Sequence, residues 1–253
     1  MTKPQQQDPH KVALVTGGSR GIGAATARRL ATSGTDVAIT YLNSRDAAED
    51  VVAYCTEQGV RAEVFRADAA SRDDMRTLVQ RVVDAFGRLD ILVNSAGIFD
   101  VKPIEETTDE EFARMMNINV RATYLTSREA AKIMPEGGRI INVGSNMAEA
   151  VKMEGATLYT LSKAAVAGFT RALARDLGPK GITVSCVQPG PTDTDMNPAD
   201  PADNPTAASQ TADTALGRYG RPEELAHTIA FLASPESAYV TGAIINVDGG
   251  SNA

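Results

Sequence analysis

Short apolar runs alternate with helical segments along nearly the whole chain. The apolar runs cover residues 12–16, 36–41, 61–67, 89–94, 139–143, 182–187 and 243–247. Helical patterns occupy residues 22–33, 44–58, 71–86, 108–134, 157–177 and 221–233. Strands that alternate with helices pair in parallel through right-handed crossovers. The alternation therefore predicts an α/β fold of the doubly wound, Rossmann type, in which one domain holds a seven-stranded parallel sheet with helices on both faces.

Composition limits the partners that such a fold can have. The chain has 253 residues and a formal net charge of −7, which argues against nucleic acid, because phosphate backbones are bound by basic surfaces. The two cysteines, Cys55 and Cys186, lack CxxC spacing, and two histidines are too few for a histidine metal site or a Ser–His–Asp triad. No apolar run reaches the roughly 18 residues of a membrane span. We therefore expect a cytoplasmic protein that acts on a small molecule, with no metal, nucleic acid or membrane partner.

Two segments fall outside the alternation. Residues 1–11 are polar and carry no apolar signal-peptide core, so we expect a disordered tail ahead of a domain formed by residues 12–253. Residues 189–216 follow a strand and are rich in Pro, Asp, Asn, Thr and Ala, without an apolar period. Long loops of this kind are often lids over a site. We expect residues 190–216 to form a substrate lid and name them the lid segment.

A glycine-rich turn lies between the first strand and the first helix. It reads TGGSRGIG over residues 16–23, with the spacing G-x-x-x-G-x-G rather than G-x-G-x-x-G. Gly17, Gly21 and Gly23 allow the backbone to turn tightly and to approach a pyrophosphate, and the helix N-terminus offers free N–H groups. The turn predicts a dinucleotide phosphate site, with a plain strand–helix turn as the alternative.

The end of the second strand indicates which dinucleotide is bound. An NAD site usually places an acid there, about 20 residues beyond the glycine motif, to hold the ribose 2′-hydroxyl. Here the chain reads YLNSR over residues 41–45, with no acid. Arg20 and Arg45 can pair with a 2′-phosphate, and Asn43 and Ser44 can donate further hydrogen bonds. We therefore expect NADP(H), while Asp46, just beyond, keeps NAD(H) as the alternative.

Four polar residues form the candidate catalytic group. Tyr159 and Lys163 are four residues apart on a predicted helix and so share one face. An ammonium beside a phenol favours the phenolate, which suits the phenol to general acid–base chemistry. Ser145 directly follows a strand, where its hydroxyl can bind a substrate carbonyl. Asn119 lies within the helix of residues 108–134, where a polar residue in a core-facing run often bends the helix or holds a water.

Together these motifs resemble the short-chain dehydrogenase/reductase family in its single-domain form, over residues 12–250. The pattern is most similar to 3-oxoacyl-carrier-protein reductases. The matching elements are the glycine-rich turn, Asp68, the sequence NSAG at residues 94–97, Asn119, Ser145, Tyr159 with Lys163, the dipeptide at 189–190 and the sequence NVDGG at 246–250. Ser95 stands where the family most often has a second Asn. The separation of Ser145 and Tyr159 is one residue longer than is usual in the family.

The resemblance implies a role for each matching residue. Tyr159 would protonate the developing alkoxide, Lys163 would assist it and hold the nicotinamide ribose, Ser145 would polarise the carbonyl, and Asn119 would anchor a water of a proton relay. The implied cofactor contacts are Gly17, Ser19, Arg20, Gly21, Ile22 and Gly23 in the turn, Asn43, Ser44 and Arg45 at the 2′-phosphate, Asp68 and Ala69 at the adenine, Asn94, Ala96 and Gly97 at the ribose wall, and Pro189, Gly190, Thr192 and Thr194 at the nicotinamide. A homotetramer is implied, with a homodimer as the alternative.

These observations predict an enzyme that reversibly reduces a ketone to a secondary alcohol with NADPH. It would act either on 3-oxoacyl thioesters or as a broad carbonyl reductase. An acyl carrier protein would need a basic patch, for which Arg121 and Arg128 are the candidates. Two alternatives remain: an NAD-dependent alcohol or sugar dehydrogenase, and a non-catalytic dinucleotide sensor. The presence of both Tyr159 and Lys163 argues against the sensor.

Overall fold

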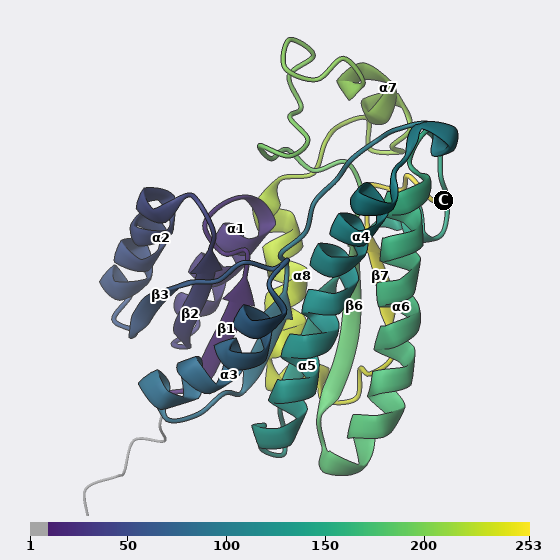
Figure 1. Cartoon of the computed structure of the whole chain (residues 1–253). Helices are drawn as coiled ribbons and strands as arrows, with labels where there is room; N and C mark the ends of the chain where they lie inside the picture. The colour runs from purple at the N-terminus through teal and green to yellow at the C-terminus, as the bar shows by residue number, and fades with distance from the viewer. Residues whose placement is uncertain (1–9) are drawn as a thin grey trace, which may run out of the picture.

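One parallel sheet forms the centre of the molecule in the computed structural model, which describes residues 10–253 (Figure 1). Its strands are β1 (Val12–Thr16), β2 (Asp36–Tyr41), β3 (Ala62–Arg66), β4 (Ile91–Asn94), β5 (Arg139–Val143), β6 (Thr183–Pro189) and β7 (Ile244–Val247). They lie in the order β3-β2-β1-β4-β5-β6-β7, and all neighbours are parallel. The predicted doubly wound, Rossmann-type fold is confirmed. The expected tail, residues 1–11, lies outside the described residues except for His10 and Lys11.

Helices cover both faces of the sheet. They are α1 (Gly21–Ala31), α2 (Arg45–Glu57), α3 (Arg72–Phe86), α4 (Asp109–Met116), α5 (Ala122–Ile133), α6 (Thr157–Leu177), α7 (Ala207–Ala212) and α8 (Pro222–Ala233). One apolar layer joins the sheet to α1, α2 and α8, and a second joins it to α3, α5 and α6. Leu14 and Val15 belong to opposite layers, since successive side chains of a strand point to opposite faces.

Several helix boundaries follow from local capping chemistry. The hydroxyl of Ser71 accepts from the backbone N–H of Asp74 at the start of α3. Thr108 and Glu111 form a capping box at the start of α4, each side chain accepting from the other residue's backbone N–H. Ser44 occupies the N-cap position of α2, as expected, but its side chain makes no capping hydrogen bond.

The single helix expected at residues 108–134 is interrupted. A π-helical turn, Asn117–Arg121, separates α4 from α5. Its cause is a long-range contact: the side chain of Asn119 accepts from the backbone N–H of Ile98 at 2.9 Å and donates to the Ile98 carbonyl at 3.0 Å. Such turns are frequent at functional sites because they redirect one side chain without ending the helix.

The lid segment also contains more regular structure than expected. It carries the short helix α7, which stands with its flanking loops at the top of the view in Figure 1. No apolar period predicted this helix, since only Ala207 of its residues is buried. In the described part of the chain, no helix is both long and apolar enough to cross a bilayer.

Candidate active site

A cavity of about 720 Å³ opens at the carboxyl ends of the central strands. It runs from the glycine-rich turn after β1, past the loops after β4 and β5, to Tyr159 on α6, and the lid segment lines it as well. Strand order reverses between β1 and β4, which is where doubly wound sheets bind ligands. One cavity therefore contains both the expected phosphate site and the expected catalytic group.

The glycine-rich turn has a backbone that only glycine tolerates. Gly17 and Gly21 have φ angles of 66° and 54°, in the left-handed region. A Cβ atom on Gly23 would lie 2.2 Å from the carbonyl oxygen of Gly17. Helix α1 then begins with no side-chain cap at Arg20 and no acid in its first turn. Its first N–H groups are thus left for an anion in the cavity. The turn residues Gly17, Ser19, Arg20, Gly21, Ile22 and Gly23 all line that cavity.

The residues expected at a 2′-phosphate divide into two groups. Arg20, Asn43 and Ser44 line the cavity. Arg45 does not, because its guanidinium is paired with Glu49 one turn along α2, at 2.7 Å. Asp46, the residue that would favour NAD(H), is not among the lining residues either. The β2 end of the cavity therefore has one arginine and no carboxylate from the start of α2.

The loops after β3 and β4 form the next part of the wall. Asp68, Ala69, Ala96 and Gly97 line the cavity. One carboxylate oxygen of Asp68 accepts from the backbone N–H of Ala70 at 2.8 Å, which fixes the carboxylate at the cavity edge.

Asn94 is the expected wall residue that the cavity does not reach. Its side chain is buried and donates to Ser127 at 3.0 Å and to the side-chain oxygen of Asn142 at 2.9 Å, and it accepts from Thr126 at 2.7 Å. These bonds join β4 to β5 and α5. Asn94 therefore supports the wall from behind.

The catalytic candidates meet at the other end of the cavity. Tyr159, Lys163 and Ser145 all line it. The Nζ atom of Lys163 lies 5.6 Å from the centre of the Tyr159 ring and donates to the Val143 carbonyl at 3.0 Å. The Ser145 hydroxyl accepts from the backbone N–H of Met147 at 3.2 Å. Its own proton remains available to a carbonyl oxygen, and a phenol, an ammonium and a hydroxyl thus face one space.

Asn119 lies behind this group. Besides its two bonds to Ile98, its side-chain amide donates to Ser162 at 3.0 Å. A Cβ atom added to Gly97 would lie 3.3 Å from Oδ1 of Asn119 and 3.6 Å from Nζ of Lys163. A side chain at position 97 would press against both groups, so the glycine allows Oδ1 of Asn119 and the ammonium of Lys163 to lie close beside this loop.

Electrostatics beneath the site argue against a thiol nucleophile. Cys186 on β6 is fully buried, and this burial raises the pKa of its thiol to about 11, while the nearby ammonium of Lys163 opposes the rise. The thiol therefore stays protonated near neutral pH. Cys55, on the far layer, is buried in the same way, with its pKa also raised to about 11.

The lid segment leaves and returns to the body at one place. The backbone N–H of Asp193 donates to the Gly220 carbonyl, and the N–H of Gly220 donates to the Pro191 carbonyl, both at 2.9 Å. Pro189, Gly190, Thr192 and Thr194 lie on the outgoing side of this stem and line the cavity.

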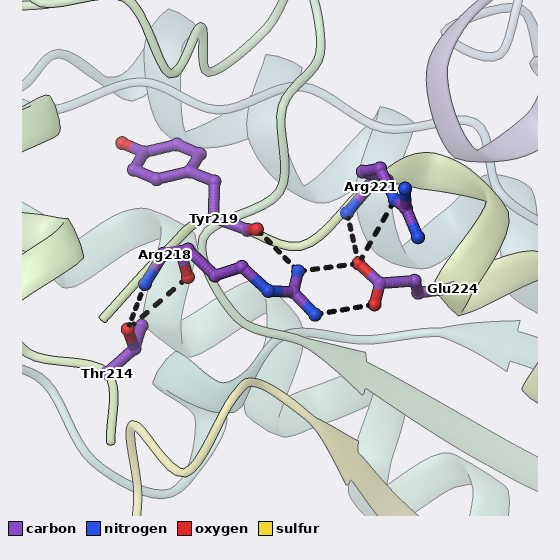
Figure 2. Close-up of polar contacts among 5 residues, drawn as sticks. All are labelled: Thr214, Arg218, Tyr219, Arg221 and Glu224. Carbon is purple, nitrogen blue, oxygen red and sulfur yellow. Dashed lines mark hydrogen bonds and ion pairs between the residues drawn. The ribbon is translucent and has the colours of Figure 1, made fainter. Parts of the chain in front are cut away.

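The returning side of the stem is fixed to α8 by charged groups (Figure 2). Arg218 makes a two-pronged contact with the carboxylate of Glu224, at 2.7 and 2.8 Å. Glu224 also accepts from the backbone N–H of Arg221 at 2.8 Å, and Thr214 accepts from the backbone N–H of Arg218. The stem is thereby held while the segment between its ends stands over the cavity.

Three residues near the catalytic group were not predicted from the sequence. Phe99 packs edge-on against Tyr159, with ring centres 4.8 Å apart. Lys152 lines the cavity and donates to the backbone carbonyls of Ser251 and Asp213. Gln188 is fully buried at the end of β6, and its side-chain amide has no hydrogen-bond partner in the described part of the chain. For Gln188 a signal existed, since an amide in an apolar strand directly before Pro189 has to be explained by a partner or a water.

Comparisons with known proteins agree with this geometry. The family model described as Enoyl-(Acyl carrier protein) reductase matches residues 17–252. A cyclic-di-GMP-binding biofilm dispersal mediator protein of Escherichia coli (strain K12) is 44% identical over 239 residues, which are 94% of this chain and 96% of that protein. A 3-oxoacyl-acyl-carrier-protein reductase of Synechocystis sp. is 40% identical over 243 residues, which are 95% of this chain and 96% of that protein.

A solved structure extends the similarity to three dimensions. The crystal structure of a short chain dehydrogenase from Burkholderia cenocepacia J2315 in complex with NADP has a TM-score of 0.94 to this structure at 48% identity. The match covers 98% of this chain and 100% of that chain. With the fold, the glycine-rich turn and the family match all in place, the chain belongs to the short-chain dehydrogenase/reductase family.

Proposed function

We propose that the protein is an NADP(H)-dependent oxidoreductase that reversibly reduces a ketone to a secondary alcohol. One observation carries this proposal: a single cavity holds an uncapped helix N-terminus at one end and Tyr159, Lys163 and Ser145 at the other. The first suits a pyrophosphate, and the second suits proton transfer to a carbonyl oxygen.

The cavity fits the phosphorylated dinucleotide. The glycines that form the turn leave no room for side chains, so the backbone can approach a diphosphate. The donors at the β2 end are Arg20, Asn43 and Ser44, with no carboxylate from the start of α2, a set that suits a 2′-phosphate. The relative from Burkholderia cenocepacia was solved with NADP. When bound, NADPH would supply the hydride. We propose that it is held by the turn residues 17–23, by Asp68 and Ala69, by Ala96 and Gly97, and by Pro189, Gly190, Thr192 and Thr194, with Asn94 supporting the wall.

The side chains of the chain itself supply orientation and protons. We propose that Ser145 donates to the substrate carbonyl and that the Tyr159 hydroxyl gives its proton to the oxygen as negative charge develops there. Lys163, held by the Val143 carbonyl, places its positive charge beside the ring of Tyr159. A water between Lys163 and Asn119 would connect the two residues and return the proton. Asn119 acts in this scheme as a positioning residue.

The surroundings favour a small ketone over a carrier-bound thioester. Arg121 donates to the backbone carbonyl of Ala70 at 2.7 Å, so it supports the loop after β3. Arg128 is paired with Glu129, which also accepts from Lys132. Neither arginine offers the exposed positive patch that an acidic carrier would need. We therefore propose a broad carbonyl reductase.

The assembly and the lid are part of the same proposal. Exposed Phe112 and Tyr124 lie on α4 and α5, and Tyr124 packs edge-on against Phe169 of α6. An apolar, aromatic face of this kind suits an interface between subunits. We propose a homotetramer, with a homodimer as the alternative, in the cytoplasm. The lid segment would close over the substrate end of the cavity.

The test is NADPH oxidation with a panel of small cyclic and aryl ketones and with an acetoacetyl thioester. We expect turnover of ketones and little of the thioester. For the cofactor, Arg20→Ala should weaken NADPH binding about tenfold, as expected for the loss of a charge-assisted hydrogen bond, and leave NADH binding unchanged. Arg45→Ala is the matched control and should change neither. Tighter binding of NADH than of NADPH would contradict the cofactor assignment. Binding without turnover of any carbonyl would point to the sensor.

A further inference from the structure

The lid segment touches the glycine-rich turn at one place. A Cβ atom on Gly21 would lie 3.2 Å from Cγ2 of Thr194, so the Thr194 side chain packs close to the backbone of the turn. At the next residue, the carboxylate of Asp195 lies 3.4 Å from the guanidinium of Arg20. Arg20 and Asp195 both line the cavity. The arginine proposed to bind the 2′-phosphate is thus already paired with a carboxylate of the lid segment.

The ion pair between Arg20 and Asp195 is exposed enough for another anion to replace the carboxylate. The side chains of Arg20 and Asp195 are 64% and 69% exposed, so water can replace either partner. Exposed ion pairs of this kind are weak. A phosphate has more charge and more acceptor oxygens than a carboxylate and therefore competes well for the guanidinium. The lid segment contains five aspartates, Asp193, Asp195, Asp200, Asp203 and Asp213, and no lysine or arginine. Nothing within the segment therefore offsets the charge of Asp195.

We propose that Asp195 is a specificity residue that lowers the preference for NADPH over NADH by competing with the 2′-phosphate for Arg20. The proposal rests on the proposed function, in which Arg20 binds that phosphate. NADPH has to displace Asp195 from Arg20 before the guanidinium can pair with the 2′-phosphate. NADH has no 2′-phosphate and leaves the pair intact. The lid segment thereby responds to which of the two dinucleotides is bound.

The test is a double-mutant cycle read by dinucleotide binding, with no substrate present. The Kd values of NADPH and NADH are measured by fluorescence titration for the wild type, Asp195→Asn, Arg20→Ala and the double variant. Asp195→Asn should tighten NADPH about twofold to fivefold, the range of an exposed ion pair, and leave NADH unchanged. The same change in the Arg20→Ala background should have no effect on NADPH. Asp203→Asn, which removes another exposed carboxylate of the lid segment, is the matched control and should change neither Kd.

Salt and a smaller probe sharpen the result. The gain in Asp195→Asn should disappear at about 1 M salt, where charges a few ångströms apart are screened. Competition by 2′-AMP, which carries the phosphate without the nicotinamide, should be strengthened in the same variant. Equal tightening of NADH, an unchanged Kd for NADPH, or a gain that persists without Arg20 would each overturn the proposal.

The two levels of proposal can fail separately. If Arg20→Ala leaves the ratio of NADPH to NADH affinity unchanged, the assignment of Arg20 to the 2′-phosphate fails, and the competition fails with it. If Arg20→Ala weakens only NADPH while Asp195→Asn changes nothing, the cofactor assignment stands and the competition alone is refuted.

Discussion

Helices α1 and α8 pack side by side on one face of the sheet but begin in opposite ways (Figure 1). Glu224, in the first turn of α8, accepts from the backbone N–H of Arg221 and from both prongs of Arg218 (Figure 2). The first turn of α1 has no acid and no side-chain cap. Both helix starts expose N–H groups and a partial positive charge. The chain places the Glu224 carboxylate at the start of α8 and leaves the first N–H groups of α1 to the cavity.

The polar groups at the start of α8 bind one another and stabilise the fold, whereas those at the start of α1 are free to bind a ligand. The hydroxyl of Tyr159 belongs with α1, since it makes no hydrogen bond to another residue in the described part of the chain, although it lines the cavity. Substitutions on the α1 side should therefore change binding or turnover. Substitutions on the α8 side should change the free energy of unfolding.

The largest effect is expected from Tyr159→Phe. Loss of a positioned proton donor costs about 10²- to 10⁴-fold in rate, so kcat for ketone reduction should fall by that factor. The Kd of NADPH and the melting temperature should stay near those of the wild type, because the hydroxyl has no bond to another described residue that would be lost. Retention of more than a few per cent of the activity would show that another group donates the proton. A large fall in melting temperature would show that the hydroxyl also stabilises the fold.

A smaller effect is expected from Gly23→Ala. The new Cβ would overlap the carbonyl oxygen of Gly17, so the turn has to shift, and overpacking of this kind costs about 1–3 kcal/mol. We expect NADPH to bind about tenfold or more weakly, measured by fluorescence titration. Gly168→Ala in α6 is the control, because a Cβ there meets nothing within 4 Å. Tight NADPH binding by Gly23→Ala would show that the turn does not hold the diphosphate.

The smallest effect is expected from Glu224→Gln. Loss of the carboxylate at the helix start should cost about 1 kcal/mol, or about 2–4 °C in melting temperature. The Kd of NADPH should not change. Glu223→Gln, in the same first turn and exposed, is the matched control and should alter stability less. A Glu224→Gln protein that loses NADPH affinity at full stability would contradict the division between α8 and α1.

The pH dependence of stability sharpens the same test. The hydrogen bonds from Arg218, with that from Arg221, hold the pKa of the Glu224 carboxyl at about 2, below its ordinary value of 4.5. A carboxyl with a lowered folded-state pKa contributes stability that is present above its unfolded pKa and is lost as pH falls toward the folded one. Wild-type stability should therefore decline between about pH 4.5 and pH 2, and the decline should be shallower in Glu224→Gln. Equal slopes in acid-unfolding titrations would show that Glu224 contributes nothing.

Local patterns in the sequence were sufficient to predict the sheet and to propose a group of candidate catalytic residues that line one cavity. Each strand is an apolar run, and parallel strands place the loops at their carboxyl ends on one edge. That rule brings the turn at Gly17 and the hydroxyl of Ser145 to one cavity without knowledge of tertiary contacts. The spacing of Tyr159 and Lys163 is a property of one helix, so it too could be read from the chain.

Most of the missed features depend on contacts between distant parts of the chain. The π-helical turn exists because Asn119 bonds to Ile98, and no property of residues 108–134 alone reveals this partner. Arg45 is different, because its partner Glu49 lies only four residues along the same helix, a spacing at which such pairs form. Asn94 ends a strand, and a side chain there can point either into the cavity or into the protein interior. It points into the interior, where it donates to Asn142. For Asn119 and Asn94, only the folded structure shows which distant residue each side chain binds.

The paired bonds between Pro191–Asp193 and Gly220 have a consequence for divergence. They hold the two ends of the loop together whatever its length. The entropic cost of closing a longer loop rises only slowly with its length, so the loop can lengthen or shorten while its ends stay in place. Insertions, deletions or exchanges among residues 196–213 can thus accumulate without shifting β6 or α8. New substrate preferences would arise as replaceable inserts on an unaltered nucleotide platform, and transplanting this insert between relatives is the natural way to redesign selectivity.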